Sequence, residues 1–146
     1  MKIAYLILAH HNPNQVVRLI NKLNNGDVSF IIHYDLGSDA KEFMYLRTVF
    51  KGKKNVHFVE NRVKGYWGDF SLISATLECI RFLINGKIDF DYAFLISGQD
   101  FPLKTNSEIF EFISKNNGKE FINVEKMPTS FWKNGGMDRL KYIHFN

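Results

Sequence analysis

The chain has 146 residues and a formal net charge of +4. This length suits one domain with its own core, and 45% hydrophobic with 23% charged residues is the composition of an ordinary globular protein. The mild positive charge favours anionic ligands but is far from that of a nucleic-acid-binding protein. The lone Cys79 excludes an intramolecular disulfide, and no apolar run in the sequence is long enough to span a bilayer. We therefore expect a cytoplasmic protein, associated at most with the inner face of the membrane.

Predicted strands and helices alternate along the first half of the chain. The apolar run at residues 2–9 is typical of a strand that is buried on both faces. Asn12 suits a helix N-cap and Pro13 the first helical position, while Asn24-Asn25-Gly26 ends that helix. The other elements expected before residue 60 are strands at 28–34 and 56–59 and a helix from 38 or 39 to about 50.

The second half continues the same alternation. Strands are expected at residues 92–96 and, more weakly, at 120–124, with helices from 69 or 71 to 85 and from 105 to about 113. The apolar face of the first of these helices is lined by Ile73, Leu77, Ile80 and Ile84. This order predicts an α/β fold with a doubly wound, mostly parallel sheet and helices on both faces. We expect residues 1–146 to form one domain that is the first part of a larger one.

Chemistry-bearing residues follow three of the predicted strands at their carboxyl ends, where open α/β sheets bind ligands. They are Ala9-His10-His11, Asp35 and Ser97-Gly98-Gln99-Asp100. The first group precedes a helix N-terminus that suits a nucleotide, and Asp35 lies where a carboxylate often binds a ribose hydroxyl. We therefore expect Asp35 and Asp100 to share one pocket. The absence of a glycine-rich phosphate fingerprint from the sequence argues against dinucleotide enzymes and P-loop NTPases.

Two other patterns suggest a metal, and we discount both. Asp89-Phe90-Asp91 is a literal Asp-x-Asp, but it precedes the fourth strand and so belongs to the opposite end of the sheet. His10, His11 and His33 match no zinc spacing, and adjacent histidines on a strand point in opposite directions. We expect no metal site.

Two further segments could contribute to a site. Gly65-Tyr66-Trp67-Gly68 precedes the clearest helix, and it is either a turn with Trp67 anchored in the core or a platform beside a base or sugar. Glu125 and Lys126 follow the weak fifth strand and stand shortly before a proline, which alone is a weak signal.

Together, five segments resemble the core-2/I-branching β-1,6-N-acetylglucosaminyltransferase family, which includes peptide O-xylosyltransferases. They are Ala9–His11, Ile32–Asp35, Trp67–Gly68 with its helix, Leu95–Asn106 and Val124–Pro128. The pattern Ser-Gly-x-Asp-x-Pro-x-Lys-Thr, which begins at Ser97, is the most specific of them.

The resemblance implies a GT-A glycosyltransferase fold. It implies inverting transfer of a sugar of the N-acetylglucosamine or xylose type from a UDP-sugar to a hydroxyl of a carbohydrate or glycoconjugate, with no metal or other cofactor. Donor binding would fall to Ala9, His10, His11, Asp35, Trp67, Gly68, Ser97, Gly98, Gln99 and Asp100, and acceptor binding to Glu125 and Lys126. The family's general-base glutamate and its diphosphate-binding Arg and Lys have no counterpart in these 146 residues.

Other functions stay open on the sequence alone. A degenerate transferase domain could serve as a binding or assembly module, which an exposed apolar face would favour. A sugar nucleotidyltransferase would share the α/β plan but would need metal-binding carboxylates at the strand ends. The third alternative is an α/β scaffold with no site.

Overall fold

The computed structural model describes residues 1–141 of the chain. The chain divides into two compact units, Met1–Lys115 and Asn116–Asn146. The strands of the first unit are β1 (Ile3–Ala9), β2 (Val28–Tyr34), β3 (Val56–Phe58) and β4 (Tyr92–Ser97). Its helices are α1 (Pro13–Leu23), α2 (Ala40–Val49), α3 (Ser71–Asn85) and α4 (Asn106–Lys115). The second unit contains the short helices η1 (Lys133–Gly136) and α5 (Asp138–Lys141).

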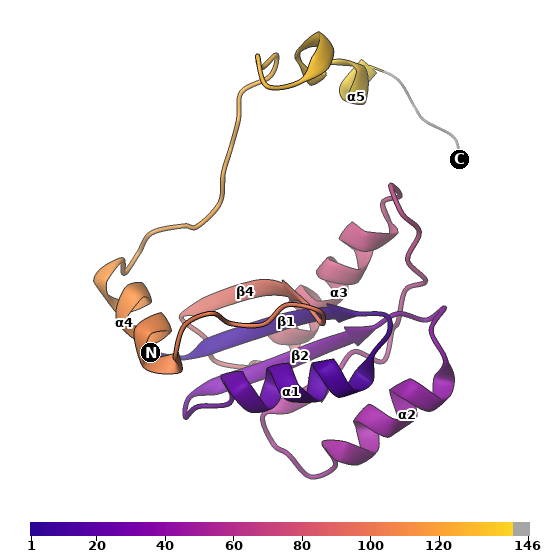
Figure 1. The fold of residues 1–146 in the computed structure, drawn as a ribbon, viewed down its shortest axis with the longest axis vertical. Helices are drawn as coiled ribbons and strands as arrows, with labels where there is room; N and C mark the ends of the chain where they lie inside the picture. The colour runs from indigo at the N-terminus through magenta and orange to yellow at the C-terminus, as the bar shows by residue number, and fades with distance from the viewer. Residues whose placement is uncertain (142–146) are drawn as a thin grey trace. The chain divides into compact units, whose positions relative to one another are not determined.

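The four strands form one sheet in the order β3-β2-β1-β4, and all neighbouring strands are parallel. Figure 1 shows β4, β1 and β2 side by side. Parallel pairing brings the carboxyl ends of all strands to one edge of the sheet. The register pairs Ala9 of β1 with Tyr34 of β2, and Leu8 of β1 with Ser97 of β4. The predicted α/β, GT-A-like fold is therefore confirmed, and the residues that follow these strands meet at one edge.

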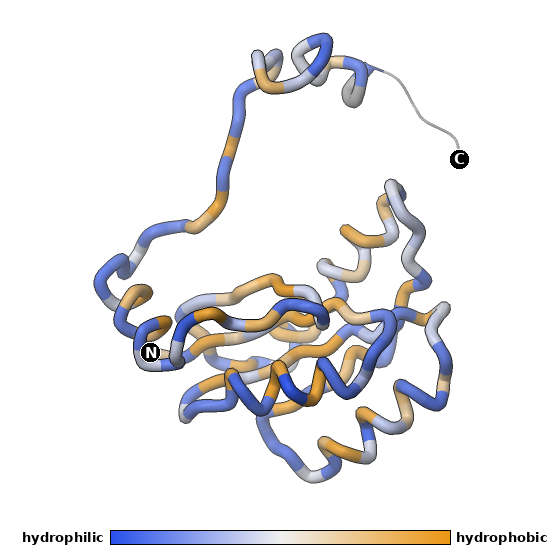
Figure 2. The backbone as a smooth tube through the Cα atoms, viewed as in Figure 1, coloured by the Kyte–Doolittle hydropathy of each residue, from blue (hydrophilic) through white to orange (hydrophobic). Residues whose placement is uncertain are grey.

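Helices cover both faces of the sheet because the strands are apolar on both sides, as Figure 2 shows for the run of β1. Tyr5 and Ile7 belong to a core that also includes residues of α1, α2 and α4. Ala4 and Leu6, which alternate with them, belong to the core on the α3 side. Burial on both faces explains why the central strands read as continuous apolar runs.

Two predicted helix starts are confirmed in detail. The Asn12 side chain caps α1 by accepting a hydrogen bond from the Gln15 backbone N–H at 3.4 Å. At α4, Glu108 Oε2 accepts the Thr105 backbone N–H at 2.9 Å, and Thr105 Oγ1 accepts the Glu108 backbone N–H at 3.3 Å. This reciprocal pair is a capping box.

The expected apolar face of α3 is not the face that packs on the sheet. Ile73 and Ile84 are 52% and 62% exposed, whereas Ala75 is buried and Cys79 and Leu83 are buried together with residues of β1 and β2. The helix carries apolar residues around most of its circumference, so the apolar periodicity is compatible with either of two faces packing on the sheet. The smaller residues of the second face bring the helix backbone close to the sheet.

The weak fifth strand is a wrong prediction. Residues 120–124 have no strand hydrogen-bonding pattern and lie in the second unit, where Ile122 and Val124 are largely exposed. A short apolar run forms a strand only when its backbone finds a hydrogen-bonded partner, and sequence pattern does not supply that partner. Within residues 1–141, no helix has the length and apolar character needed to cross a membrane.

Candidate functional site

A pocket of about 700 Å³ opens at the carboxyl edge of the sheet, beyond β1, β2 and β4. This volume falls within the range of about 300–1,000 Å³ that is typical of ligand pockets. Residues from the ends of three strands, from the loop before α3 and from the first turns of α3 line it. They are Leu8, Ala9, His10, His33, Asp35, Gly37, Ser38, Gly65, Tyr66, Trp67, Leu72, Ala75, Leu95, Ile96, Ser97 and Asp100.

Asp35 is held by backbone donors from two loops. Its Oδ1 accepts the Gly37 N–H and its Oδ2 accepts the Gly65 N–H, each at 2.6 Å. A Cβ added at residue 65 would stand 2.8 Å from Oδ2, so the glycine is what permits this approach. The two bonds fix the carboxylate, and each oxygen keeps a further lone pair that can accept a ligand hydroxyl.

Asp100 closes the tight turn that follows β4. Its Oδ2 accepts the Ser97 backbone N–H at 2.8 Å, and its own N–H donates to the Ser97 carbonyl at 3.0 Å. Gly98 in this turn does not line the pocket; its backbone instead packs against Ala9 and Val16. The pocket thus contains two carboxylates, Asp35 and Asp100, each held in place by backbone N–H groups.

The two histidines after β1 are arranged differently from the prediction. Their rings stack, with centroids 4.2 Å apart and an interplanar angle of 18°, instead of pointing to opposite sides. The reason is that β1 ends at Ala9, so the alternation of a strand no longer applies to His10 and His11. Ser38 Oγ donates to the His10 carbonyl at 2.5 Å and ties the first loop to the second.

Trp67 is 93% exposed and lines the pocket, so the alternative of a tryptophan anchored in the core is wrong. Its neighbour Gly68 has φ +78°, a backbone conformation that favours glycine. The Lys64 ammonium stands 5.3 Å from the centre of the Tyr66 ring and places a positive charge beside the same loop. An exposed indole at the rim can stack on a base or a sugar ring.

The pocket therefore brings together six of the predicted donor-site residues: Ala9, His10, Asp35, Trp67, Ser97 and Asp100. Four others do not line it: His11, Gly68, Gly98 and Gln99. Glu125 and Lys126 belong to the second unit. Sequence reasoning missed Gly37 and Ser38 as pocket residues, although both follow Asp35 directly in a turn that could have drawn attention to them.

The Asp-x-Asp segment lies at the opposite end of the sheet, as expected. Asp91 Oδ2 accepts the Lys2 backbone N–H at 2.6 Å, and Asp89 pairs with the Lys2 ammonium at 3.0 Å. Both carboxylates thus bind Lys2, the residue just before β1. Among residues 1–141, no cluster of three or more His, Cys, Asp or Glu side chains could hold a metal ion.

His33 has a structural role at the edge of the pocket. It is 2% exposed, and its Nε2 accepts the Val63 backbone N–H at 2.8 Å, so this nitrogen is unprotonated. Burial holds the pKa of His33 below its ordinary value of 6.5, against the opposing effect of the nearby Asp35 charge. Protonation would remove the acceptor that fixes the loop before α3.

The low pKa of His33 predicts an acid-sensitive fold. The unfolded chain takes up this proton below about pH 6.5 while the folded chain resists it. The contribution to stability is therefore complete above that pH and is lost as the pH falls toward the folded-state pKa, with a slope of up to about 1.4 kcal/mol per pH unit. In urea titrations from pH 7.5 to 5, His33→Gln should lose less stability on acidification than the native chain, because glutamine can accept the Val63 N–H without titrating. Equal slopes would contradict this role of His33.

The pocket lies at the carboxyl edge of a parallel α/β sheet, which is where open sheets of this type bind ligands. A family model described as Branch, Core-2/I-Branching enzyme, matches residues 3–144. The chain belongs to the Core-2/I-Branching enzyme family, which agrees with the resemblance found in its motifs.

Individual relatives support this assignment. The chain is 28% identical over 143 residues to "Xylosyltransferase oxt" of Drosophila pseudoobscura pseudoobscura, which is 95% of this chain and 16% of that protein. It is 32% identical over 145 residues to "Xylosyltransferase 2" of Homo sapiens, which is 96% of this chain and 16% of that protein. It is 26% identical over 142 residues to "N-acetyllactosaminide beta-1,6-N-acetylglucosaminyl-transferase" of Mus musculus, which is 97% of this chain and 34% of that protein. The chain thus spans 16% to 34% of the length of these relatives, which are named as glycosyltransferases.

Proposed function

We propose that this chain supplies the donor-binding part of an inverting glycosyltransferase. The donor is a UDP-sugar of the N-acetylglucosamine or xylose type, the acceptor is a hydroxyl of a carbohydrate or glycoconjugate, and no metal takes part. The observation that carries the proposal is that Asp35 and Asp100, 65 positions apart in the sequence, line one pocket at the carboxyl edge of the sheet. The names of the relatives support glycosyl transfer as the reaction.

The pocket residues have chemistry that suits the donor. Asp35 can accept the ribose hydroxyls because two backbone N–H groups already hold its carboxylate in place. The exposed Trp67 offers a stacking surface, and Asp100 can accept hydroxyls of the transferred sugar. His10 lines the pocket and precedes the start of α1 in the chain, where the helix dipole favours an anion.

The chemical step needs two further groups. An acceptor oxygen attacks the anomeric carbon while a base takes its proton, and the bond from that carbon to the diphosphate oxygen breaks so that UDP leaves. The departing negative charge needs cations or hydrogen-bond donors. The residues that line the pocket include no Lys or Arg, and both of its carboxylates are bound to backbone N–H groups. We therefore assign neither Asp35 nor Asp100 as the base.

Calorimetric titration tests the proposal. We expect UDP to bind the 146-residue chain weakly, with the same affinity in excess EDTA as in Mg²⁺, and UDP-sugar turnover by this chain alone to be very slow or absent. Binding that strictly requires Mg²⁺ would point to a sugar nucleotidyltransferase. The absence of UDP binding in both buffers, confirmed with a longer protein that contains the chain, would overturn the proposal.

One observation favours a second candidate, a binding or assembly module. The outer face of α3 exposes Ile73, Ile80 and Ile84, which is unusual for a surface helix. Concentration-dependent self-association in analytical ultracentrifugation, together with no UDP binding, would favour this alternative.

A further inference from the structure

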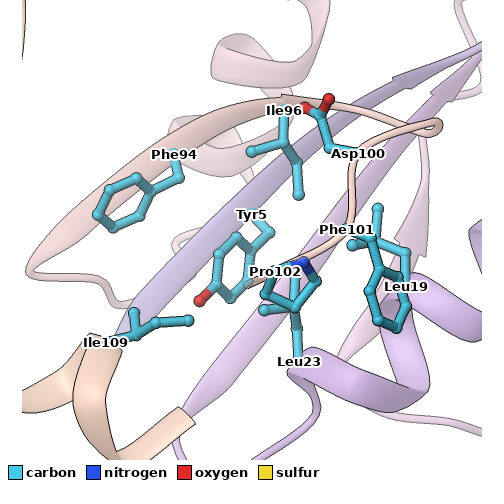
Figure 3. A pocket seen from close by; sticks show the side chains of 9 residues that line it. All are labelled: Tyr5, Leu19, Leu23, Phe94, Ile96, Asp100, Phe101, Pro102 and Ile109. Atoms are coloured by element: carbon cyan, nitrogen blue, oxygen red, sulfur yellow. The ribbon is translucent and has the colours of Figure 1, made fainter. Parts of the chain in front are cut away.

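A second pocket lies on the other side of β1 and β4 from α3, among residues of the α1 side (Figure 3). Its volume is about 280 Å³, close to the lower end of the ligand-pocket range. The side chains that line it are Tyr5, Leu19, Leu23, Phe94, Ile96, Asp100, Phe101, Pro102 and Ile109. They come from β1, α1, β4, the segment after β4 and α4, so five parts of the first unit enclose one space.

The segment that follows β4 and lines this pocket, Asp100–Pro102, is attached to α1. The Gln15 side-chain amide donates to the Asp100 carbonyl at 3.5 Å, and the Arg18 guanidinium stands 5.6 Å from the centre of the Phe101 ring. Just beyond, the Asn106 amide donates to the Lys22 carbonyl at 2.9 Å. Several independent contacts therefore fix the position of the segment that lines this pocket.

The pocket is apolar and aromatic with a single neutral polar group inside it. The rings of Tyr5 and Phe94 lie 5.9 Å apart, and the pyrrolidine of Pro102 stands near them. Within the described range 1–141 the Tyr5 hydroxyl has no hydrogen-bond partner, and it is not among the polar atoms that are shut off from water. In Figure 3 it points toward the side of the pocket where Ile109 lies.

Charged side chains at the rim of the pocket affect whether it binds ions or neutral molecules. Asp100 borders the pocket, and its carboxylate points away from the middle of the cavity (Figure 3). The Arg18 guanidinium beside Phe101 offsets this negative charge, so the rim favours a neutral ligand over an ion, and the small volume excludes a nucleotide-sugar. A planar ring can pack against the accessible parts of these aromatic side chains, and one hydrogen-bonding group on it could take the place of water at the Tyr5 hydroxyl.

We propose that this pocket binds a small neutral aromatic molecule that carries one hydrogen-bonding group, with its ring among Tyr5, Phe94 and Pro102 and its polar group on the Tyr5 hydroxyl. The site is separate from the proposed donor pocket, although Ile96 and Asp100 border both. The inference does not depend on the proposed glycosyltransferase function.

Phenol and toluene are a matched pair of probes for this site. In the full 146-residue chain with ¹³C-labelled methyl groups, phenol should shift the resonances of Leu19, Leu23, Ile96 and Ile109 and leave those of Ile84 on α3 unchanged. Tyr5→Phe should weaken phenol binding about 2- to 10-fold, the worth of one hydrogen bond, and leave toluene binding unchanged. Phenol shifts scattered over the chain, or no shifts up to the solubility limit, would overturn the proposal.

A filling variant separates the pocket from general surface adsorption. Ile109→Trp should abolish the binding of both probes because the indole occupies the cavity. The matched control is Ile84→Trp, which places the same ring on an exposed position of α3 and should leave binding unchanged. Undiminished phenol binding by a folded Ile109→Trp chain would count against the site. If that variant does not fold, the methyl shifts of the native chain and the Tyr5→Phe comparison decide the question.

Discussion

Asp35→Ala should lower both the stability of the chain and its affinity for UDP. The carboxylate accepts two backbone N–H groups at 2.6 Å, from Gly37 and Gly65, and alanine leaves both without this acceptor. Hydrogen bonds to a charged group contribute about 1.5–3 kcal/mol each, and partial exposure to water reduces the loss, so we expect about 2–3 kcal/mol in urea unfolding. Loss of the ribose contact should weaken UDP binding about 10- to 100-fold in calorimetry.

Asp39→Ala is the matched control for this prediction. Asp39 lies four positions further along, caps α2 by accepting the Lys41 N–H at 2.8 Å, and does not line the pocket. Its replacement should cost about 1 kcal/mol and leave UDP affinity unchanged. A drop in UDP affinity of the same size in both variants would show that general loosening of the loop, and not the Asp35 carboxylate, controls binding. Full UDP affinity in Asp35→Ala would restrict Asp35 to a structural role.

The first unit was largely predictable because its signals are local. Buried parallel strands give unbroken apolar runs, and the caps at Asn12 and Thr105 depend on residues only three positions away. The meeting of Asp35 and Asp100 in one pocket was also predictable, because parallel pairing brings all carboxyl ends to one edge.

Two of the wrong predictions involve contacts between distant residues. The face of α3 that packs is decided by the sheet beneath it, and a strand at 120–124 would need a partner that no local pattern specifies. The opposite orientation expected for His10 and His11 failed because β1 ends one residue earlier than the pair. The donor-binding roles, the acceptor roles of Glu125 and Lys126, the absence of a metal and the cytoplasmic location stay predictions.

Gly98, which belongs to the most specific sequence motif, has a packing role that the motif does not reveal. The family resemblance assigned Gly98 to donor binding, whereas the structure places it against the end of β1 and the first turn of α1. A Cβ at residue 98 would stand 2.7 Å from the Ala9 Cβ and 3.1 Å from Val16 Cγ2. Both neighbours are buried, so neither can move aside freely. The need for glycine here comes from close packing that positions the turn bearing Asp100.

Gly98→Ala should therefore destabilise the chain by about 1–3 kcal/mol in urea unfolding, because overpacking forces either the turn or β1 to shift. Ala9→Gly removes the nearest obstructing atom and provides the decisive test. Alone it should cost about 0.5–1 kcal/mol, as glycine does in a strand. Combined with Gly98→Ala it should restore part of the lost stability, so that the double variant is more stable than the sum of the two single effects predicts by about 1 kcal/mol. Strict additivity would mean that the contact between residues 9 and 98 does not limit the packing of this turn.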